Sequence, residues 1–171
     1  MIALLNEYID ITASIVTRHG GMVDKIVGDA VHALFNAPID LENHIDHAID
    51  CAIEIIDATE AFRKSQLGAR SQFGRTRIGV ESGVVVVGEI GSKGKLDYTA
   101  HGAAMNLASR LEQANKRFGT DILVGPTAVA GSSRHTYVIC GHITAYDGAN
   151  PIPTSTPVRP IAAPGAGGTI N

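Results

Sequence analysis

The stretch GGMVDKIVGDAVHALF, residues 20–35, predicts a β-hairpin. Two short runs rich in apolar residues, 22–27 and 30–35, flank Gly28 and Asp29, and a Gly-Asp pair makes a tight turn. A carboxylate at a hairpin tip projects free of neighbouring side chains, so Asp29 is a candidate ligand for a hard cation such as Mg²⁺. Lys25 lies on the incoming strand. Spacing alone favours a simpler interpretation, an ordinary turn with a solvated lysine.

Amphipathic helices are predicted on both sides of this hairpin. Upstream, residues 1–19 carry apolar side chains at helical spacing, and Gly20-Gly21 supplies the C-terminal stop. Downstream, Asp40 is a fair N-cap for a second long helix over residues 41–64. Its apolar stripe consists of Ile45, Ala48, Ile49, Ala52, Ile53 and Ile56.

The rest of the chain alternates between strand and helix patterns. Residues 76–81 and 84–90 predict a second hairpin, punctuated by glycines. A third helix is expected over 102–117, then a short strand at Ile122–Val124, with one more helical turn starting at Pro126. Helices interleaved with antiparallel hairpins indicate an α+β fold with helices over a sheet.

Composition limits the function classes. The chain has 171 residues, enough for one domain, and a formal net charge of −3, which argues against a nucleic-acid partner. No apolar run approaches the roughly 18 residues of a membrane span, and the N-terminus lacks the basic region of a signal peptide. The two cysteines, Cys51 and Cys140, form neither a disulfide framework nor a zinc pattern. We therefore expect a soluble, cytoplasmic protein, with one domain over residues 1–149 and a disordered Pro/Gly-rich tail over 150–171.

The third helix carries a polar stripe opposite its predicted core face. Asn106 and Arg110 are four residues apart, so an amide and a guanidinium reach the same place. A guanidinium matches phosphate oxygens, and an amide can hydrogen-bond a sugar oxygen. An ordinary solvated face explains the same pattern, and the residues alone leave both interpretations open.

A third group of polar side chains lies on the second helix. His44, His47 and Cys51, with Asp46 and Asp50, have a spacing that could chelate a transition metal. We favour a solvated helix face, because nothing else in the chain supplies supporting ligands. The lone His32 and His101 are interpreted as packing or capping residues.

Several motifs in order resemble the catalytic domain of class III adenylate and guanylate cyclases. HGGMVDKIVGDA (19–30) and FNAP (35–38) resemble the metal-binding hairpin of that family. Four further motifs follow in the family's order and spacing: RIGVESG (77–83), VGEIG (87–91), DYT (97–99) and NLASRLE (106–112). The resemblance covers about residues 1–125 and implies an α+β nucleotide cyclase sandwich with a ferredoxin-like core.

The resemblance also implies a role for five residues. Asp29 matches the second of two metal-binding aspartates. Lys25 matches the lysine that contacts the purine, and Thr99 matches its partner, a combination that favours adenine. Asn106 matches the residue that orients the ribose, and Arg110 the one that stabilises charge on the reacting phosphate.

The implied function is adenylate cyclase activity in intracellular signal transduction. ATP would cyclise by attack of its 3′-hydroxyl on the α-phosphate, with two Mg²⁺ or Mn²⁺ ions in the intact family site. The implied partner is a second copy of the same domain in a head-to-tail homodimer, in which Asp29 faces Asn106 and Arg110 across the interface. We expect a cytosolic location, alone or as part of a longer membrane-bound or sensor-linked protein.

Departures from the family pattern support an alternative. The motif with the first metal-binding aspartate, and the strand that carries it, are absent, and no lysine follows Lys116 to bind the triphosphate. We therefore expect the chain to lack its first strand and to be inactive alone. The alternative function is a non-catalytic cyclase-homology module for dimerisation or nucleotide-dependent regulation. A diguanylate cyclase is disfavoured, because the hairpin lacks a Gly-Gly-Asp-Glu-Phe-like turn.

Overall fold

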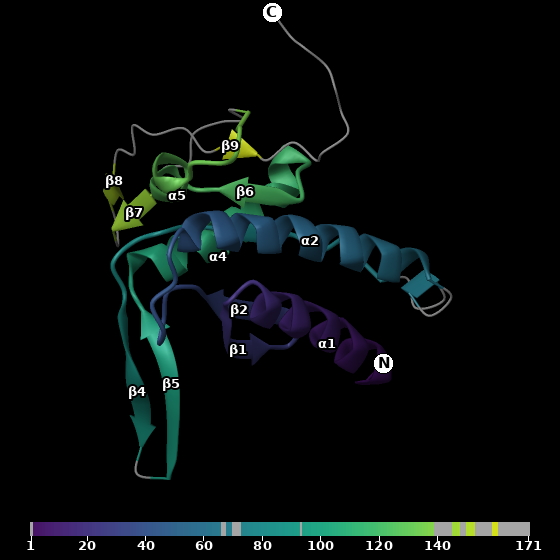
Figure 1. Cartoon of the computed structure of the whole chain (residues 1–171), viewed down its shortest axis with the longest axis horizontal. Coiled ribbons are helices and arrows are strands. Elements are labelled where there is room, and N and C mark those ends of the chain that lie inside the picture. Colours follow the sequence, from purple (N-terminus) through teal and green to yellow (C-terminus); the bar gives the residue numbers. More distant parts are fainter. Residues whose placement is uncertain are drawn as a thin grey trace, which may run out of the picture.

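The computed structural model describes residues 2–65, 68–69, 73–92, 94–138, 145–147, 150–152 and 159–160. Its helices, shown in Figure 1, are α1 (Ile2–Arg18), α2 (His44–Lys64), α4 (Ala103–Phe118) and α5 (Pro126–Gly131). The predicted first and third helices and the helical turn at Pro126 are confirmed. The second helix begins at His44 and not at residue 41, because Asn43 has a left-handed φ of 53°.

The strands form separate small sheets. They are β1 (Met22–Val27), β2 (Ala30–Leu34), β3 (Ile78–Val80), β4 (Val86–Ser92), β5 (Lys95–His101), β6 (Ile122–Val124), β7 (Ala145–Asp147), β8 (Asn150–Ile152) and β9 (Arg159–Pro160). Strands β1 and β2 form the predicted antiparallel hairpin, and β3, β6 and β9 form a sheet with β6 in the middle. In the described part of the chain no ladder joins the β1–β2 hairpin to β3. The expected α+β class, with helices packed on mainly antiparallel strands, is confirmed.

The predicted pairing of residues 76–81 with 84–90 is wrong. Strand β3 pairs in parallel with β6, and β4 pairs instead with β5 in an antiparallel hairpin. The reason is burial: β3 lies against α4 and the core, so its ladder partner is another core strand and not the next strand along the chain.

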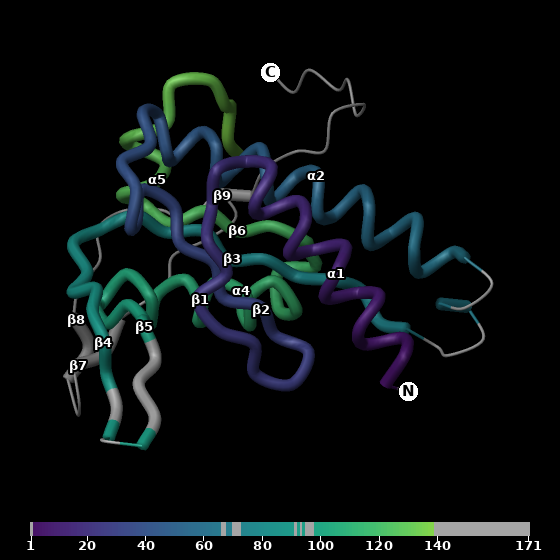
Figure 2. Tube along the Cα trace, turned by 60° about the horizontal axis from the view of Figure 1, so that its bottom comes forward, coloured from purple at the N-terminus to yellow at the C-terminus, as the bar shows by residue number. Residues whose placement is uncertain are grey.

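Helix α2 lies between two parts of the hydrophobic core. Ile49 and Ala52 pack with Ile122 and Val124 of β6 and with Ala128 of α5. On the adjacent face of α2, Cys51 and Ile55 pack with Ile15 and Val16 of α1. Helix α1 therefore lies alongside α2, as Figures 1 and 2 show.

A close contact between β3 and α4 fixes the orientation of α4. An added Cβ on Gly79 would lie 2.5 Å from the backbone nitrogen of Glu112 and closer still to the carbonyl oxygen of Ala108. Next to it, the buried Asn115 donates from Nδ2 to the Ile78 carbonyl oxygen at 2.9 Å and accepts from Thr120 Oγ1 at 2.7 Å. These contacts turn Leu111 and Asn115 inward, so Asn106 and Arg110 are exposed.

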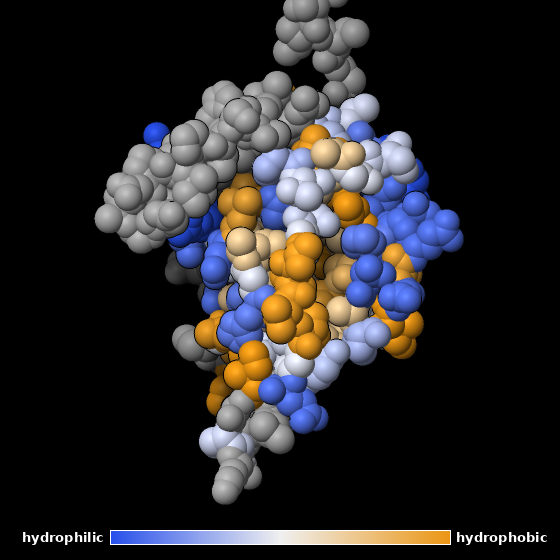
Figure 3. Space-filling view, turned by 90° about the vertical axis from the view of Figure 1, so that its left-hand side faces the viewer, coloured by the Kyte–Doolittle hydropathy of each residue, from blue (hydrophilic) through white to orange (hydrophobic). Residues whose placement is uncertain are grey.

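Strands β4 and β5 project from the rest of the molecule as a two-stranded arm (Figures 1 and 2). Apolar side chains at its base are open to solvent: Val84 is 96% exposed and Val86 is 72% exposed. Figure 3, which presents the left-hand side of Figure 1, shows a band of hydrophobic residues bordered by hydrophilic ones. Exposed apolar side chains normally lie singly on a solvated surface, so a continuous band of them is unusual.

Two further expectations concern the membrane and the tail. In the described segments, no helix is both long and apolar enough to span a bilayer. Short strands are described at Asn150–Ile152 and Arg159–Pro160, and the other residues after 149 lie outside the described part. The domain boundary at 149 therefore stays a prediction.

The β3–α4 contact predicts the effect of a single methyl group. We expect Gly79→Ala to lower the free energy of unfolding by about 3 kcal/mol, because two backbones must separate to admit the Cβ. The measurement is urea denaturation. The matched control is Gly88→Ala, where an added Cβ meets no atom within 4 Å, and its effect should stay within about 0.5 kcal/mol. Equal stability of the two variants would contradict the close-packing argument.

Candidate functional site

A cavity of about 170 Å³ lies between the β1–β2 hairpin, the end of β5 and the first turns of α4. Its lining residues are Lys25, His32, Ala100, His101, Gly102, Met105, Asn106 and Ser109. Pockets that enclose a drug-sized ligand measure about 300–1,000 Å³, so this cavity is suited to one part of a larger molecule. The lining combines an ammonium, two imidazoles, an amide and a hydroxyl with a few apolar groups.

Local structure brings these side chains together. The hairpin register sets Lys25 opposite His32 on the neighbouring strand. Strand β5 ends at His101, and Gly102 leads directly into α4, so Asn106 lies in the first turns of that helix. Strands β1 and β5 are also in contact. Two segments distant in sequence thus form the two walls of one cavity.

The structure places the five predicted site residues in four positions. Lys25 and Asn106 line the cavity. Thr99 is next to the lining residue Ala100; it is 7% exposed, and its Oγ1 has no hydrogen bond within the described segments. Arg110 is exposed one turn beyond Asn106 on α4, and Asp29 is exposed at the hairpin tip; neither is among the cavity's lining residues.

Asp29 lies toward α1. Tyr8 of α1 has a raised pKa, first because it is buried and then because the carboxylates of Asp29 and Glu112 act on it. The described residues of one chain thus line a cavity of about 170 Å³ beside the hairpin and present a separate carboxylate at the hairpin tip.

The structure places His32 and His101, which the sequence led us to interpret as packing or capping residues, at the cavity wall. Both line the cavity beside Lys25 and Asn106. For His32 the signal was present in the sequence, because the predicted hairpin register sets it opposite Lys25. For His101 it was not, because its approach to β1 depends on the packing of β5.

Metal ligands are sparse in the described part of the chain. It contains no group of three or more His, Cys, Asp or Glu side chains able to hold a metal ion. Asp29 alone offers an exposed carboxylate at a tip. Magnesium is commonly held by one or two carboxylates together with substrate phosphates, so Asp29 fits a cation shared with a phosphate ligand.

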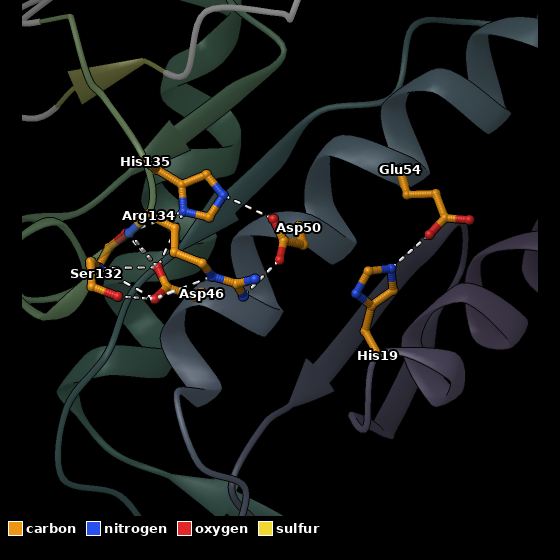
Figure 4. Close-up of polar contacts among 8 residues, drawn as sticks. His19, Asp46, Asp50, Glu54, Ser132, Arg134 and His135 are labelled. Atoms are coloured by element: carbon orange, nitrogen blue, oxygen red, sulfur yellow. Dashed lines mark hydrogen bonds and ion pairs between the residues drawn. The ribbon is translucent and has the colours of Figure 1, made fainter.

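The polar group on α2 is neither a metal site nor a solvated face. Figure 4 shows Asp46 and Asp50 pointing to the segment after α5. Asp46, 2% exposed, accepts hydrogen bonds from Ser132 Oγ at 2.6 Å and Ser133 Oγ at 2.7 Å, and backbone N–H groups of that segment also donate to it. Asp50 binds His135 Nε2 at 2.9 Å and Arg134 at 2.8 Å. The name α2 clasp is used below for this cluster, which consists of Asp46, Asp50, Ser132, Ser133, Arg134 and His135.

The α2 clasp holds serine, histidine and aspartate within hydrogen-bond distance of one another: Ser132 Oγ lies 3.2 Å from His135 Nδ1, and His135 Nε2 lies 2.9 Å from Asp50. The shorter contact of Ser132 Oγ, at 2.6 Å, is the hydrogen bond that it donates to the Asp46 carboxylate, so its proton is directed away from the imidazole of His135, unlike in a hydrolase triad. His135 lies between two carboxylates and joins them. Apart from the clasp, Glu54 of α2 pairs with His19 at 2.6 Å and with Arg18, which ties α1 to α2.

Electrostatics make Asp46 a stabilising group. Burial by itself raises the pKa of its carboxyl, but the hydrogen bonds from Ser132, Ser133 and His135 outweigh burial and hold the pKa well below the ordinary 3.8. Because the folded pKa lies below the unfolded one, the stabilisation is complete above about pH 4 and is lost as the pH falls through the folded value.

Comparisons with known proteins agree on one family. The model of the adenylate and guanylate cyclase catalytic domain matches residues 1–139. Adenylate cyclase 1 of Rhizobium meliloti is 40% identical over 130 residues, which cover 76% of this chain and 20% of that protein. An adenylate cyclase of Anabaena cylindrica is 32% identical over 133 residues, covering 75% of this chain and 26% of that protein. The chain thus spans about a fifth to a quarter of the length of these relatives.

Solved structures show the same fold. The guanylyl cyclase Cya2 superposes with a TM-score of 0.77 at 26% identity, covering 95% of this chain and 80% of that one. The adenylyl cyclase CyaB from P. aeruginosa gives a TM-score of 0.77 at 25% identity, covering 94% and 81%. Similarity of fold does not discriminate between the two purines.

The α2 clasp predicts a pH-dependent stability. We expect Asp46→Asn to lower the free energy of unfolding by about 2–4 kcal/mol at neutral pH, because the buried donors lose their charged acceptor. The loss should shrink as the pH falls below about 4, because the unfolded chain then binds a proton that the folded Asp46 carboxylate takes up only at lower pH. Chemical denaturation across pH 2–7 measures both effects. Asp57→Asn, on the exposed side of α2, is the control; an Asp46→Asn variant with the same stability curve as this control would contradict the assignment.

Proposed function

The chain belongs to the family of adenylate and guanylate cyclase catalytic domains, and from this premise we propose that it is an adenylate cyclase domain. It converts ATP to 3′,5′-cyclic AMP and pyrophosphate in intracellular signal transduction. One observation carries the proposal: Lys25 of β1 and Asn106 of α4 line a single cavity, with the buried hydroxyl of Thr99 next to it.

The base is read by Lys25 and Thr99. The ammonium of Lys25 donates to the N1 acceptor of adenine, and Thr99 Oγ1 accepts from the 6-amino group. Guanine carries a proton on N1, so the same ammonium meets a donor. A buried polar group left without its partner costs about 1–3 kcal/mol, which is the source of the preference for ATP.

The ribose and phosphates extend from the cavity along the exposed stripe of α4. Asn106 orients the ribose, and Arg110, one turn further on, faces the α-phosphate. The 3′-oxygen forms a bond to the α-phosphorus while the bond to the leaving pyrophosphate breaks, and the hydroxyl proton passes to solvent. Arg110 stabilises the charge that develops on the phosphate oxygens, so catalysis rests on positioning and electrostatics.

Asp29 is the residue that would hold a divalent cation, Mg²⁺ or Mn²⁺. Such a cation, bound to the triphosphate, would neutralise charge on the reacting phosphates. The described residues offer this single exposed tip carboxylate and no ligand cluster. Because Asp29 and the triphosphate together could still hold one cation, we replace the expected inactivity of the chain alone with slow turnover.

A second copy of the chain completes the site. Asp29 is not among the residues that line its own chain's cavity, and Val84 and Val86 at the apolar base of the β4–β5 arm are exposed to solvent. A head-to-tail homodimer buries Val84 and Val86 and brings Asp29 of one protomer toward Asn106 and Arg110 of the other.

The alternative is a non-catalytic module that dimerises and binds nucleotide. The sparse metal ligands favour it. Formation of cyclic AMP from ATP and Mn²⁺, measured by chromatography, distinguishes the two. Slow turnover that Arg110→Ala and Asn106→Ala both abolish supports the cyclase; nucleotide binding without turnover supports the module.

The purine assignment predicts tighter binding of ATP than of GTP. We expect a difference of about tenfold or more in Kd, and Lys25→Glu should remove it, because the carboxylate repels the N1 acceptor of adenine. Isothermal titration calorimetry measures both affinities. Lys116→Glu, on the exposed far end of α4, is the charge-matched control. Equal or tighter binding of GTP by the wild type would exclude the adenylate assignment.

The dimer predicts a sensitive apolar contact. We expect Val84→Asp to shift the chain from dimer to monomer in sedimentation velocity, because a charge replaces a side chain buried between copies. Ile2→Asp changes a side chain that is 77% exposed at the start of α1 and should leave the dimer intact. A wild type that stays monomeric at high concentration would refute the shared site.

A further inference from the structure

Asp24 occupies an irregular position in β1. The hairpin register pairs Val23 with Ala33 and Lys25 with His32, so Asp24 is the extra residue of a β-bulge. A bulge disturbs the strict alternation of side chains along a strand and can re-aim one of them. In β1 the bulge sets a carboxylate directly beside the lysine that lines the cavity.

The Asp24 side chain is fully buried, with 0% exposure. Neither of its carboxylate oxygens has a hydrogen bond in the described part of the chain. Its ion pair is with Lys25, whose Nζ lies 3.6 Å from Oδ2. A charge removed from water without hydrogen bonds is costly, so this carboxylate does little for the stability of the fold.

Asp46 provides the contrast of a structural aspartate in the same fold. Both aspartates are buried, but Asp46 accepts hydrogen bonds from the Ser132 and Ser133 hydroxyls and from backbone groups. Buried polar groups are normally satisfied in this way, and the exceptions need an explanation. Local rules are most often broken at functional sites, and Asp24 breaks this rule next to the cavity.

The position of Lys25 explains why the Asp24 carboxylate is buried without hydrogen bonds. Its side chain is 39% exposed and ends in a flexible ammonium that, without a partner, would turn toward solvent. The cavity offers it no other anion: the remaining polar lining groups are two imidazoles, an amide and a hydroxyl. The buried carboxylate 3.6 Å away is therefore the group that holds the ammonium at the cavity wall.

We infer that Asp24 is a positioning residue that fixes the Lys25 ammonium for purine recognition and thereby sets the preference for ATP over GTP. The inference rests on the proposed function. It assigns the discrimination to a pair of adjacent residues in the bulge, one buried and one exposed, acting together with the Thr99 hydroxyl.

The test is the effect of Asp24→Asn on both stability and selectivity in the whole chain. We expect an unchanged or raised melting temperature, because a buried charge is removed. We also expect the ratio of the Kd values for GTP and ATP to fall about tenfold, equivalent to about 1.4 kcal/mol. Calorimetric titrations with ATP and with GTP measure that ratio. Asp57→Asn, an exposed residue of α2, should change neither quantity.

A double-mutant comparison shows whether Asp24 acts through Lys25. In a Lys25→Gln background, Asp24→Asn should have no further effect on selectivity, and Asp24→Glu should restore part of it in the Lys25 background. These readouts would not respond to a purely structural role.

The possible failures are distinct. A wild type that binds neither nucleotide, or does not discriminate, refutes the proposed function and the inference with it. A wild type that prefers ATP while Asp24→Asn keeps the full preference refutes the inference alone. Should Asp24→Asn unfold, the carboxylate is structural and the inference is wrong; the Lys25→Glu titrations still test the purine site.

Discussion

The contact of β3 with α4 at Gly79 is the constraint on which the site depends. Two backbones approach so closely there that a glycine is required, and Asn115 holds the helix to the Ile78 carbonyl. Once that face of α4 is inside, the helical period leaves Asn106 and Arg110 on the outer stripe.

The two buried aspartates have different roles: Asp46 stabilises the fold, and Asp24, in our inference, positions Lys25 for recognition. Asp46 is surrounded by donors from the segment after α5, and its lowered pKa records a carboxylate more stable charged in the fold than in water. Asp24 lacks such donors within the described residues and faces an ammonium at the edge of a cavity. Burial alone does not identify a structural residue; the number of hydrogen bonds received does.

In the proposed homodimer, the cavity of one copy and Asp29 of the other would complement each other. The cavity and the Arg110 guanidinium would bind base, ribose and phosphate, whereas Asp29 lies toward α1 at the hairpin tip. The apolar base of the β4–β5 arm is open on the same molecule. A self-complementary association of two copies would cover the apolar base of the arm. It would also bring Asp29 of one copy to the cavity of the other, which is why we propose shared sites.

The sequence alone determined helices α1, α4 and α5, most of α2, the first hairpin and the family, because these follow from local periodicity, turn chemistry and ordered motifs; it did not predict β5. It also indicated Lys25 and Asn106, which the structure brings into one cavity. It did not determine that β3 pairs with β6, that Asp46 and Asp50 bind residues 132–135, or that His101 reaches the hairpin. Each of these depends on contacts between distant segments, whose partners are selected by burial and packing in the folded chain and leave no periodic trace in the sequence.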